Sequence, residues 1–149
     1  MEIFGFRDRA HREYAENLGV FLQIVNIVRD IREDQHLGRL YLPSEDFKRF
    51  HLHPDHLEER NSHWAPFIHF QLDRAWSFLE KSRKALSRRQ RAALPTAEAI
   101  AAVYVRLFHD LKRHPSKILR GKHSLSKSSK LIAAASAALR CLWWKGTQA

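Results

Sequence analysis

The sequence contains little cysteine, glycine or proline. A single cysteine, Cys141, among 149 residues excludes a disulfide framework and a cysteine-based zinc site. Five glycines, five prolines and no alternating apolar runs argue against a sheet with many tight turns. No apolar stretch is close to the length of about 18 residues that a membrane-spanning helix needs. The first residues lack the pattern of a signal peptide. We therefore expect an all-helical protein in a reducing, cytoplasmic setting.

Positive charge is concentrated in the second part of the chain. The net charge is +10, with 44% hydrophobic and 28% charged residues, which is typical of a folded globular chain. Residues 1–60 hold nine basic and twelve acidic side chains, whereas residues 61–149 hold seventeen basic and four acidic ones. A segment this basic attracts polyanions: nucleic acid, anionic lipid or diphosphate. Composition does not distinguish among them.

Capping and breaking residues divide the chain into helices. Asp8 is a suitable N-cap for a first helix that ends near His36, with Gly38 just past its end. Ser44 can cap a short helix that His51–His56 then breaks, and Pro95 with Thr96 marks a later break and cap. Beyond the first helix, we expect helices over about 45–50, 62–93, 97–113 and 126–143.

The first helix carries a polar stripe. Gln23, Asn26, Asp30 and Asp34 fall within an arc of about 80° at 100° per residue. Apolar residues cover most of the remaining circumference, which predicts a buried helix. Because unpaired buried carboxylates are costly, a divalent cation that itself holds a phosphate group would explain them. The apolar set is Leu18, Phe21, Leu22, Ile24, Val25, Ile27, Val28 and Ile31.

A solvated edge is the alternative interpretation of this stripe. Carboxylates four residues apart are common on ordinary helices, where they pair with nearby arginines. Arg29, Arg32 and Arg39 are the available partners. The spacing of the carboxylates does not decide between the two interpretations, although the amides within an apolar stretch favour a binding site.

A segment of thirty residues, Tyr14–Pro43, resembles a known family. It contains N-x-x-R-D-x-x-x-D followed by G-R-x-Y-L-P, and is similar to the second aspartate-rich motif of squalene and phytoene synthases. Ala101–Tyr104 and Gly121–Leu131 resemble the C-terminal end of that family more weakly. The Lys/Ser-rich connector is most similar to that of bacterial members that make presqualene diphosphate for hopanoid lipids.

The resemblance implies an all-α isoprenoid-synthase-type helical bundle with a central cavity. It implies Mg²⁺-dependent, head-to-head condensation of two prenyl diphosphates, farnesyl or geranylgeranyl, through a cyclopropylcarbinyl diphosphate to presqualene, squalene or phytoene. A reacting centre of this kind stabilises the leaving diphosphate with metal and cations. The implied roles are metal binding for Asn26, Asp30 and Asp34, substrate binding for Gln23, Arg29 and Arg39, and catalytic contact for Tyr41 and Tyr104.

The chain departs from the family pattern in one respect. Family members carry two aspartate-rich motifs on facing helices, whereas this sequence has one. Residues 1–149 correspond to the C-terminal portion of the family domain, so the chain resembles a truncated or split member. A separate N-terminal half or a second copy would complete the site, and we expect this chain by itself to lack part of the catalytic site. The alternative function is a non-catalytic basic helical module that binds anionic lipid or, less in keeping with the motif, nucleic acid.

Two other features have both a simple and a functional interpretation. The basic runs Lys81–Lys84 and Arg88–Arg91, and the pair Trp143 and Trp144 near the C-terminus, are compatible with peripheral contact to an anionic membrane. A solvated helix face and a core-edge position are the simpler interpretations. The histidines within 51–56 are best explained as a solvated loop, since no cysteine lies nearby.

Overall fold

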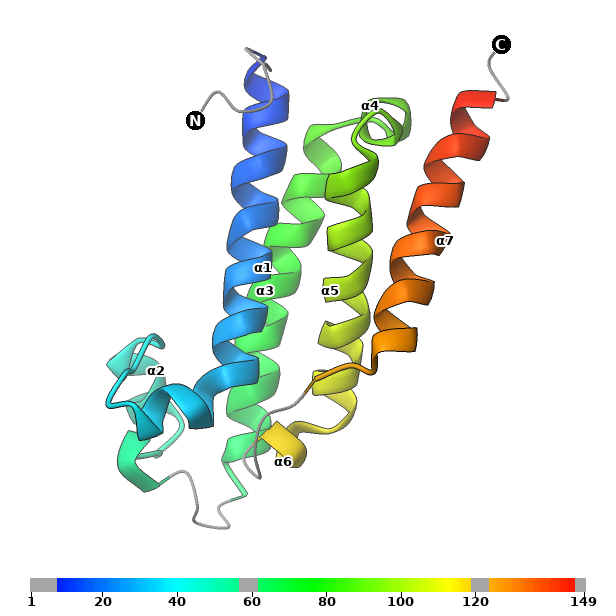
Figure 1. The fold of residues 1–149 in the computed structure, drawn as a ribbon. Helices are drawn as coiled ribbons and strands as arrows, with labels where there is room; N and C mark the ends of the chain where they lie inside the picture. The colour runs from blue at the N-terminus through cyan, green and yellow to red at the C-terminus, as the bar shows by residue number, and fades with distance from the viewer. Residues whose placement is uncertain (1–7, 57–61, 119–123, 147–149) are drawn as a thin grey trace.

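Four long helices form the body of the molecule. A computed structural model describes residues 8–56, 62–118 and 124–146, apart from the side chains of residue 55 and residues 144–146. Successive long helices run in opposite directions along one another, with the short helices at the two ends (Figure 1). The described residues contain no strand, so the expected all-α class is confirmed. The elements are α1 (Arg9–His36), α2 (Ser44–Arg49), the 3₁₀ turn η1 (Pro54–His56), α3 (Trp64–Ala85), α4 (Arg88–Ala92), α5 (Pro95–Arg113), α6 (Pro115–Ile118) and α7 (Lys127–Gly146).

The ends of α1 agree with the prediction. Asp8 caps the helix, its Oδ1 accepting from the backbone N–H of Ala10 at 3.2 Å. At the other end, Gly38 adopts φ +69° and donates its N–H to the carbonyl of Gln35 at 2.9 Å. That left-handed conformation favours glycine because it has no Cβ. It turns the chain back toward the helix that it has just left.

The core lies mainly between α1 and α3. One stripe of α1 packs against α3, while α5 covers both and α7 packs on α5 and α4. Polar contacts supplement this packing, because Ser82 Oγ donates to the carbonyl of Tyr14 at 2.9 Å and the Tyr14 hydroxyl donates to Glu98 Oε1 at 2.9 Å. The fully buried large side chains include Phe21, Val25, Val28, Phe67, Ile68, Leu72, Leu79 and Leu111.

The predicted helix over 62–93 is two helices. Leu86 is extended, with φ −124° and ψ 139°, and ends α3. Ser87 then starts α4 through a capping box: its hydroxyl accepts from the N–H of Gln90 at 3.3 Å, and Gln90 Oε1 accepts from the N–H of Ser87 at 2.9 Å. The pattern Ser-x-x-Gln is a known helix-start signal. It was visible in the sequence and outweighs the continuing apolar periodicity.

The two other predicted caps are wrong by a residue or two. Ser44 is the first residue of α2 and Pro43 its N-cap, with no side-chain cap hydrogen bond. Pro95 is the first residue of α5, whose N-cap is Leu94, so Thr96 lies inside the helix. Proline suits a first helical position because it has no N–H to leave unpaired. The turn η1 and helix α6 were not predicted.

A buried polar cluster attaches α2 to α3. The Asp46 carboxylate accepts from Gln71 Nε2 at 2.9 Å and from Arg74 Nη1 at 2.8 Å. Burial alone would raise the pKa of Asp46, but the hydrogen bonds from Gln71 and Arg74 outweigh it and lower the pKa. Beside this cluster, the ring of Phe47 lies 4.7 Å from that of Phe67. Because α2 is held in this way, the loop over 37–43 is fixed beside the end of α1.

Candidate functional site

The polar stripe of α1 lies on the side of the helix away from α3. Asn26, Asp30 and Asp34 are partly buried, and Gln23 is exposed. The neighbouring Val20 is also exposed. The prediction that α1 is buried on almost all sides is therefore wrong, since the described elements cover the α3 and α5 sides and leave the stripe open. The apolar residues beside the stripe face a surface as well as the core.

Arg29 pairs with Asp30, the residue that follows it in the chain. Its Nε donates to Asp30 Oδ1 at 2.8 Å, and its Nη2 donates to Oδ2. Both side chains are about three-quarters buried. The hydrogen bond to Asp30 is the main cause that raises the pKa of Arg29, against the effect of burial. The solvated-edge interpretation expected Arg29 to pair with a carboxylate of the stripe, and this pair is present. Both of its side chains are partly buried, however, and not fully solvated.

Tyr104 reaches the stripe from α5. Its hydroxyl donates to Asn26 Oδ1 at 3.0 Å and so joins α5 to α1 through residues that are 78 positions apart in sequence. The phenol also contributes to the raised pKa of Arg29. Tyr104, Asn26, Arg29 and Asp30 therefore form one connected polar group on the outer side of α1.

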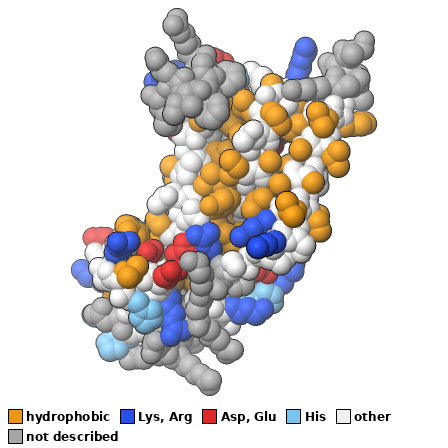
Figure 2. All heavy atoms as spheres, in the orientation of Figure 1, with side chains coloured by type: hydrophobic (Ala, Val, Ile, Leu, Met, Phe, Trp, Pro, Cys, Tyr) orange, Lys and Arg blue, Asp and Glu red, His pale blue; other side chains and the backbone are white. Residues whose placement is uncertain are grey.

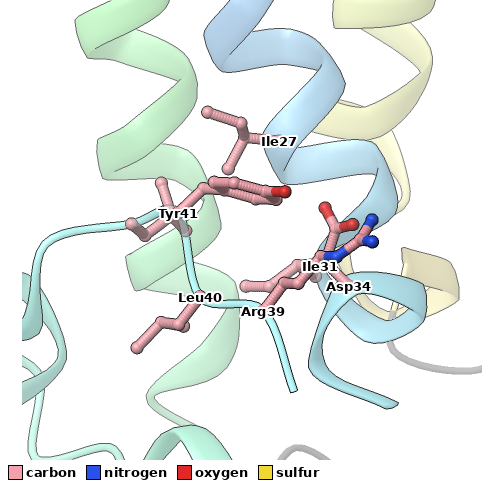
Figure 3. A pocket seen from close by; sticks show the side chains of 7 residues that line it. Ile27, Ile31, Asp34, Arg39, Leu40 and Tyr41 are labelled. Atoms are coloured by element: carbon pink, nitrogen blue, oxygen red, sulfur yellow. The ribbon is translucent and has the colours of Figure 1, made fainter. Parts of the chain in front are cut away.

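The second carboxylate lies in a small open pocket. The hollow between the last turns of α1 and the loop over 37–43 is shallow and open to solvent, with about 10 Å³ accessible to a water-sized molecule. The carboxylate of Asp34, the guanidinium of Arg39 and the phenol of Tyr41 point toward one another there (Figure 3). The backbone N–H of Arg39 donates to the carbonyl of Asp34 at 2.8 Å, which fixes the two residues side by side. The remaining lining residues are Ile27, Ile31, Leu40 and Leu42.

Asp34 differs from Asp30 in its surroundings. The structure gives Asp30 two hydrogen bonds from Arg29, whereas Asp34 has no side-chain hydrogen bond or ion pair with any described residue. A carboxylate that is partly buried and faces a pocket beside a guanidinium is suited to binding a ligand that brings its own positive charge or hydrogen-bond donors.

Sequence reasoning missed the apolar floor of this pocket. Ile27 and Ile31 were assigned to the core, and Leu40 was not assigned a role. The signal was present for the two isoleucines, because Ile31 lies about one turn and Ile27 about two turns before Asp34 on the adjoining side of the helix. No sequence signal marked Leu40. Gln23, which the resemblance assigns to substrate binding, is exposed at the end of the stripe and makes no hydrogen bond with Asn26 or Tyr104.

The donor set for a metal consists of oxygen atoms. Within the described part of the chain, no group of three or more His, Cys, Asp or Glu side chains could hold a metal ion. Asp30, Asp34 and the amide oxygen of Asn26 supply two carboxylates and one neutral oxygen. Mg²⁺ is commonly bound by one or two carboxylates, with water and substrate phosphate as its other ligands. These residues fit that ion and fit a zinc site poorly.

Known proteins resemble the chain over most of its length. The family model described as squalene/phytoene synthase matches residues 1–129. The phytoene synthase of Mycobacterium tuberculosis is 31% identical over 142 residues, covering 92% of this chain and 47% of the relative. The 15-cis-phytoene synthase of Synechococcus elongatus is 37% identical over 71 residues (46% of this chain, 23% of the relative). The chloroplastic phytoene synthase of Daucus carota is 26% identical over 132 residues (87% and 33%).

These matches are limited in two ways. The chain spans less than half the length of each of these relatives. No solved structure gives a significant match. The similarity therefore concerns the part of the relatives that this sequence covers.

Proposed function

The chain belongs to the squalene/phytoene synthase family, and from this we propose that it is the diphosphate-binding part of a head-to-head prenyl synthase. The reaction would join two prenyl diphosphates, farnesyl or geranylgeranyl, to give presqualene, squalene or phytoene. One observation supports this most: Asp34, Arg39 and Tyr41 line one pocket, and Tyr104 donates to Asn26 about two turns earlier on the same stripe of α1. Carboxylates for a cation and guanidinium groups for phosphate thus lie on one surface.

We propose Mg²⁺ as the metal and Asp30, Asp34 and Asn26 as its protein ligands. The ion would neutralise the diphosphate as negative charge develops on it when the carbon–oxygen bond breaks. The partly buried positions of these three side chains are compatible with such a role. The fit depends on the chemistry of the donor set, which contains only oxygen.

The other residues of the site have roles that follow from their contacts. Arg29 holds the Asp30 carboxylate in one orientation through two hydrogen bonds. Tyr104 orients the amide of Asn26, whose oxygen accepts from the Tyr104 hydroxyl on α5. Arg39 and Tyr41 lie on the loop side of the pocket, where a guanidinium and a phenol can donate to phosphate oxygens. Gln23, further along the stripe, would contact the substrate beyond its diphosphate.

The proposed site is incomplete within this chain. The sequence carries one aspartate-rich motif, and the polar stripe is open on its outer side. We therefore propose that residues 1–149 correspond to the C-terminal portion of the family domain. A separate N-terminal half or a second copy of the chain would supply the opposite metal site and the pocket for the prenyl tail. The covered length of the relatives, 47% or less in the three described above, supports this arrangement.

Binding of farnesyl diphosphate to the purified chain tests the ligand assignment. Calorimetric titration with and without Mg²⁺ should show binding that depends on the metal. Asp30→Asn and Asp34→Asn should each weaken it by about tenfold or more, as loss of metal-site groups usually does. Glu13→Gln is the matched control, since it removes the same charge from an exposed position on α1. Equal binding by all four proteins would refute the assignment.

Turnover tests the proposal that the chain is part of a synthase. Product formation from farnesyl and geranylgeranyl diphosphate should require both Mg²⁺ and an added N-terminal half from a family member. The product would identify the reaction. If a folded, reconstituted mixture forms no product with either substrate, the synthase proposal fails.

A binding module is the second candidate function, supported by the seventeen basic residues after position 60. Vesicle or DNA binding that is strong and unchanged by Asp30→Asn and Asp34→Asn, together with no metal-dependent diphosphate binding, would favour this function. Cytoplasmic location stays a prediction. In the described part of the chain, no helix is long and apolar enough to cross a membrane.

A further inference from the structure

The middle of the loop that carries Arg39 and Tyr41 is weakly held by its own side chains. Leu40 is 44% exposed and Tyr41 is 55% exposed, and Arg39 is exposed as well. These residues reach the pocket of Asp34 from a segment without regular secondary structure. A segment of this kind depends on its two ends for its position. The ends therefore determine where the guanidinium and the phenol lie.

The two ends of this loop are held in different ways. At the first end, the backbone N–H of Arg39 donates to the carbonyl of Asp34 at 2.8 Å, so the loop is tied directly to α1. At the second end the loop passes into α2, where the N–H of Asp46 donates to the carbonyl of Pro43 at 3.1 Å. The position of the second end is therefore the position of α2.

Two kinds of contact attach α2 to α3. The apolar contact is made by Phe47, which is 1% exposed and packs against Phe67 with 4.7 Å between the ring centres. The polar contact is made by the Asp46 carboxylate, which accepts from Gln71 and, at both of its oxygens, from Arg74 at 2.8 and 3.2 Å. A helix of six residues has little stability of its own. These contacts therefore determine how α2 lies.

The polar contact supplies direction, which the apolar contact does not. Gln71 is completely buried and Asp46 is 8% exposed, although packed apolar side chains at such positions are often equally or more stabilising. A guanidinium that bonds both oxygens of a carboxylate fixes the orientation of both groups. Arg74 also donates to Gln71 Oε1 at 3.2 Å, so all three side chains are oriented relative to one another. The cluster thus fixes the angle of α2 on α3 as well as its attachment.

A stacking contact lies beside this cluster. The guanidinium of Arg49 on α2 is 4.7 Å from the centre of the Phe70 ring on α3, and that of Arg74 is 5.0 Å from the same centre. Such contacts between a cation and a ring are attractive. Figure 2 shows acidic and basic side chains gathered on the lower part of the molecule, where Figure 1 places α2 and the end of α1. The attachment of α2 therefore lies at the same end of the bundle as the pocket.

We propose that Asp46 and Gln71 are positioning residues for this pocket. They hold α2 in the orientation on α3 that places Arg39 and Tyr41 beside Asp34. Neither of them is among the residues that line the pocket, so they act through the loop and not by touching a ligand. This inference rests on the proposed function, because its consequence is weaker diphosphate binding when every group that contacts the diphosphate is still present.

Limited digestion with trypsin tests the position of the loop without any ligand. The complete chain can be cleaved after Arg39 in the loop and after Arg88 in α4, at the opposite end of the bundle (Figure 1). Asp46→Ala should be cleaved after Arg39 about tenfold faster than wild-type protein, because α2 then detaches locally. Cleavage after Arg88 should change little. Asp46→Asn keeps one acceptor for Gln71 and should show a smaller increase.

Affinity for inorganic pyrophosphate in the presence of Mg²⁺ tests the consequence for binding. Calorimetric titration should show that Asp46→Ala binds pyrophosphate about tenfold more weakly than wild-type protein, which is the usual effect of losing a group that orients a binding site from behind. Asp46→Asn should restore part of this affinity. Circular dichroism should show that every variant is folded at the temperature of the titration.

Ser82→Ala is the matched control. Ser82 is completely buried on the same helix α3 and donates to the carbonyl of Tyr14, so its substitution also removes a buried hydrogen bond. It lies about 16 Å further along α3 than Gln71, near the opposite end of the bundle. Ser82→Ala should leave both the cleavage after Arg39 and the affinity for pyrophosphate unchanged.

The results that overturn this inference differ from those that overturn the proposed function. If Asp46→Ala and Ser82→Ala are cleaved equally fast after Arg39, Asp46 acts only through overall stability and the inference fails. It also fails if the loop of Asp46→Ala is cleaved faster while pyrophosphate binds as strongly as to wild-type protein. If wild-type protein binds neither pyrophosphate nor farnesyl diphosphate, the proposed function fails, and the cleavage rates still decide whether Asp46 positions the loop.

Discussion

Replacing Asp46 should show how much the attachment of α2 contributes to the fold. This carboxylate is 8% exposed and accepts hydrogen bonds from Gln71 and Arg74. Gln71 is completely buried, so Asp46→Ala would leave its amide without an acceptor. We predict that Asp46→Ala lowers the free energy of unfolding by about 3 kcal/mol.

The magnitude follows from the lost hydrogen bond of the buried Gln71 and from the lost contact of the partly exposed Arg74. A hydrogen bond to a charged acceptor contributes about 1.5–3 kcal/mol, and a buried donor left unpaired costs about 1–3 kcal/mol. The Arg74 side chain is 36% exposed, so water replaces much of its lost contact and its contribution is small. Asp46→Asn keeps one acceptor for Gln71 and should cost less, about 1–2 kcal/mol.

The effect of Asp46 should depend on pH in a defined direction. Its pKa in the folded state lies below the ordinary value of 3.8. A group with a lowered pKa stabilises the fold above the pKa of the unfolded state, and this stabilisation is lost as pH falls through the folded pKa. The difference between wild-type protein and Asp46→Asn should thus be constant near neutral pH and shrink below about pH 4.

Urea unfolding followed by circular dichroism measures these differences. Asp46→Ala should lower the melting temperature by about 6–12 °C, at about 2–4 °C per kcal/mol for a chain of this size. Asp73→Ala is the control, because its ion pair with Lys112 at 2.5 Å is at the surface and should contribute under about 1 kcal/mol. A loss below about 1 kcal/mol for Asp46→Ala would refute the energetic argument.

Three further substitutions have expected outcomes. Tyr14→Phe should cost about 1–2 kcal/mol, because it removes the hydrogen bond to Glu98 from a buried hydroxyl. Burial, and then the Glu98 carboxylate, raise the pKa of Tyr14. The stabilisation that Tyr14 contributes is therefore present below the unfolded pKa of about 10 and is lost as pH rises through the folded pKa. Ultraviolet titration should find one phenol that ionises only at higher pH, and three normal phenols would contradict this. Gly38→Ala should cost about 1 kcal/mol through its positive φ alone, since no atom lies within 4 Å of the added Cβ, and an unchanged urea midpoint would contradict it. Ser87→Ala should cost about 1 kcal/mol by removing the cap on Gln90, and a loss no larger than that of an exposed Ser77→Ala control would show that the capping box contributes nothing.

The sequence predicted the first helix and its polar stripe well, for a local reason. The cap at Asp8, the turn at Gly38 and the spacing of Asp30 and Asp34 depend on residues within a few positions of one another. Periodicity was less informative at Leu86, where the apolar pattern continues through a backbone break that the cap at Ser87 fixes. Local hydrogen bonds outweighed the longer pattern there.

The contacts that assemble the candidate site were not predictable from spacing. Tyr104 reaches Asn26 only because α5 packs beside α1. Asp46 reaches Gln71 and Arg74 only because α2 folds back on α3. In neither case does the sequence contain a signal that joins the two partners, since such pairings depend on how whole helices pack.

The sequence by itself determined the helical class, the family and the residue types of the oxygen-rich motif. These properties depend on composition and on short spacing, which a single chain displays directly. Only the tertiary structure decided that Tyr104 reaches Asn26, that Asp34 faces a pocket with Arg39 and Tyr41, and that the stripe is open. The same holds for α7, because its sequence does not show which of its apolar residues are buried. In the structure α7 packs against α5, and Leu139 and Leu142 lie on the exposed side. Burial depends on which faces meet, and that is a property of the folded chain.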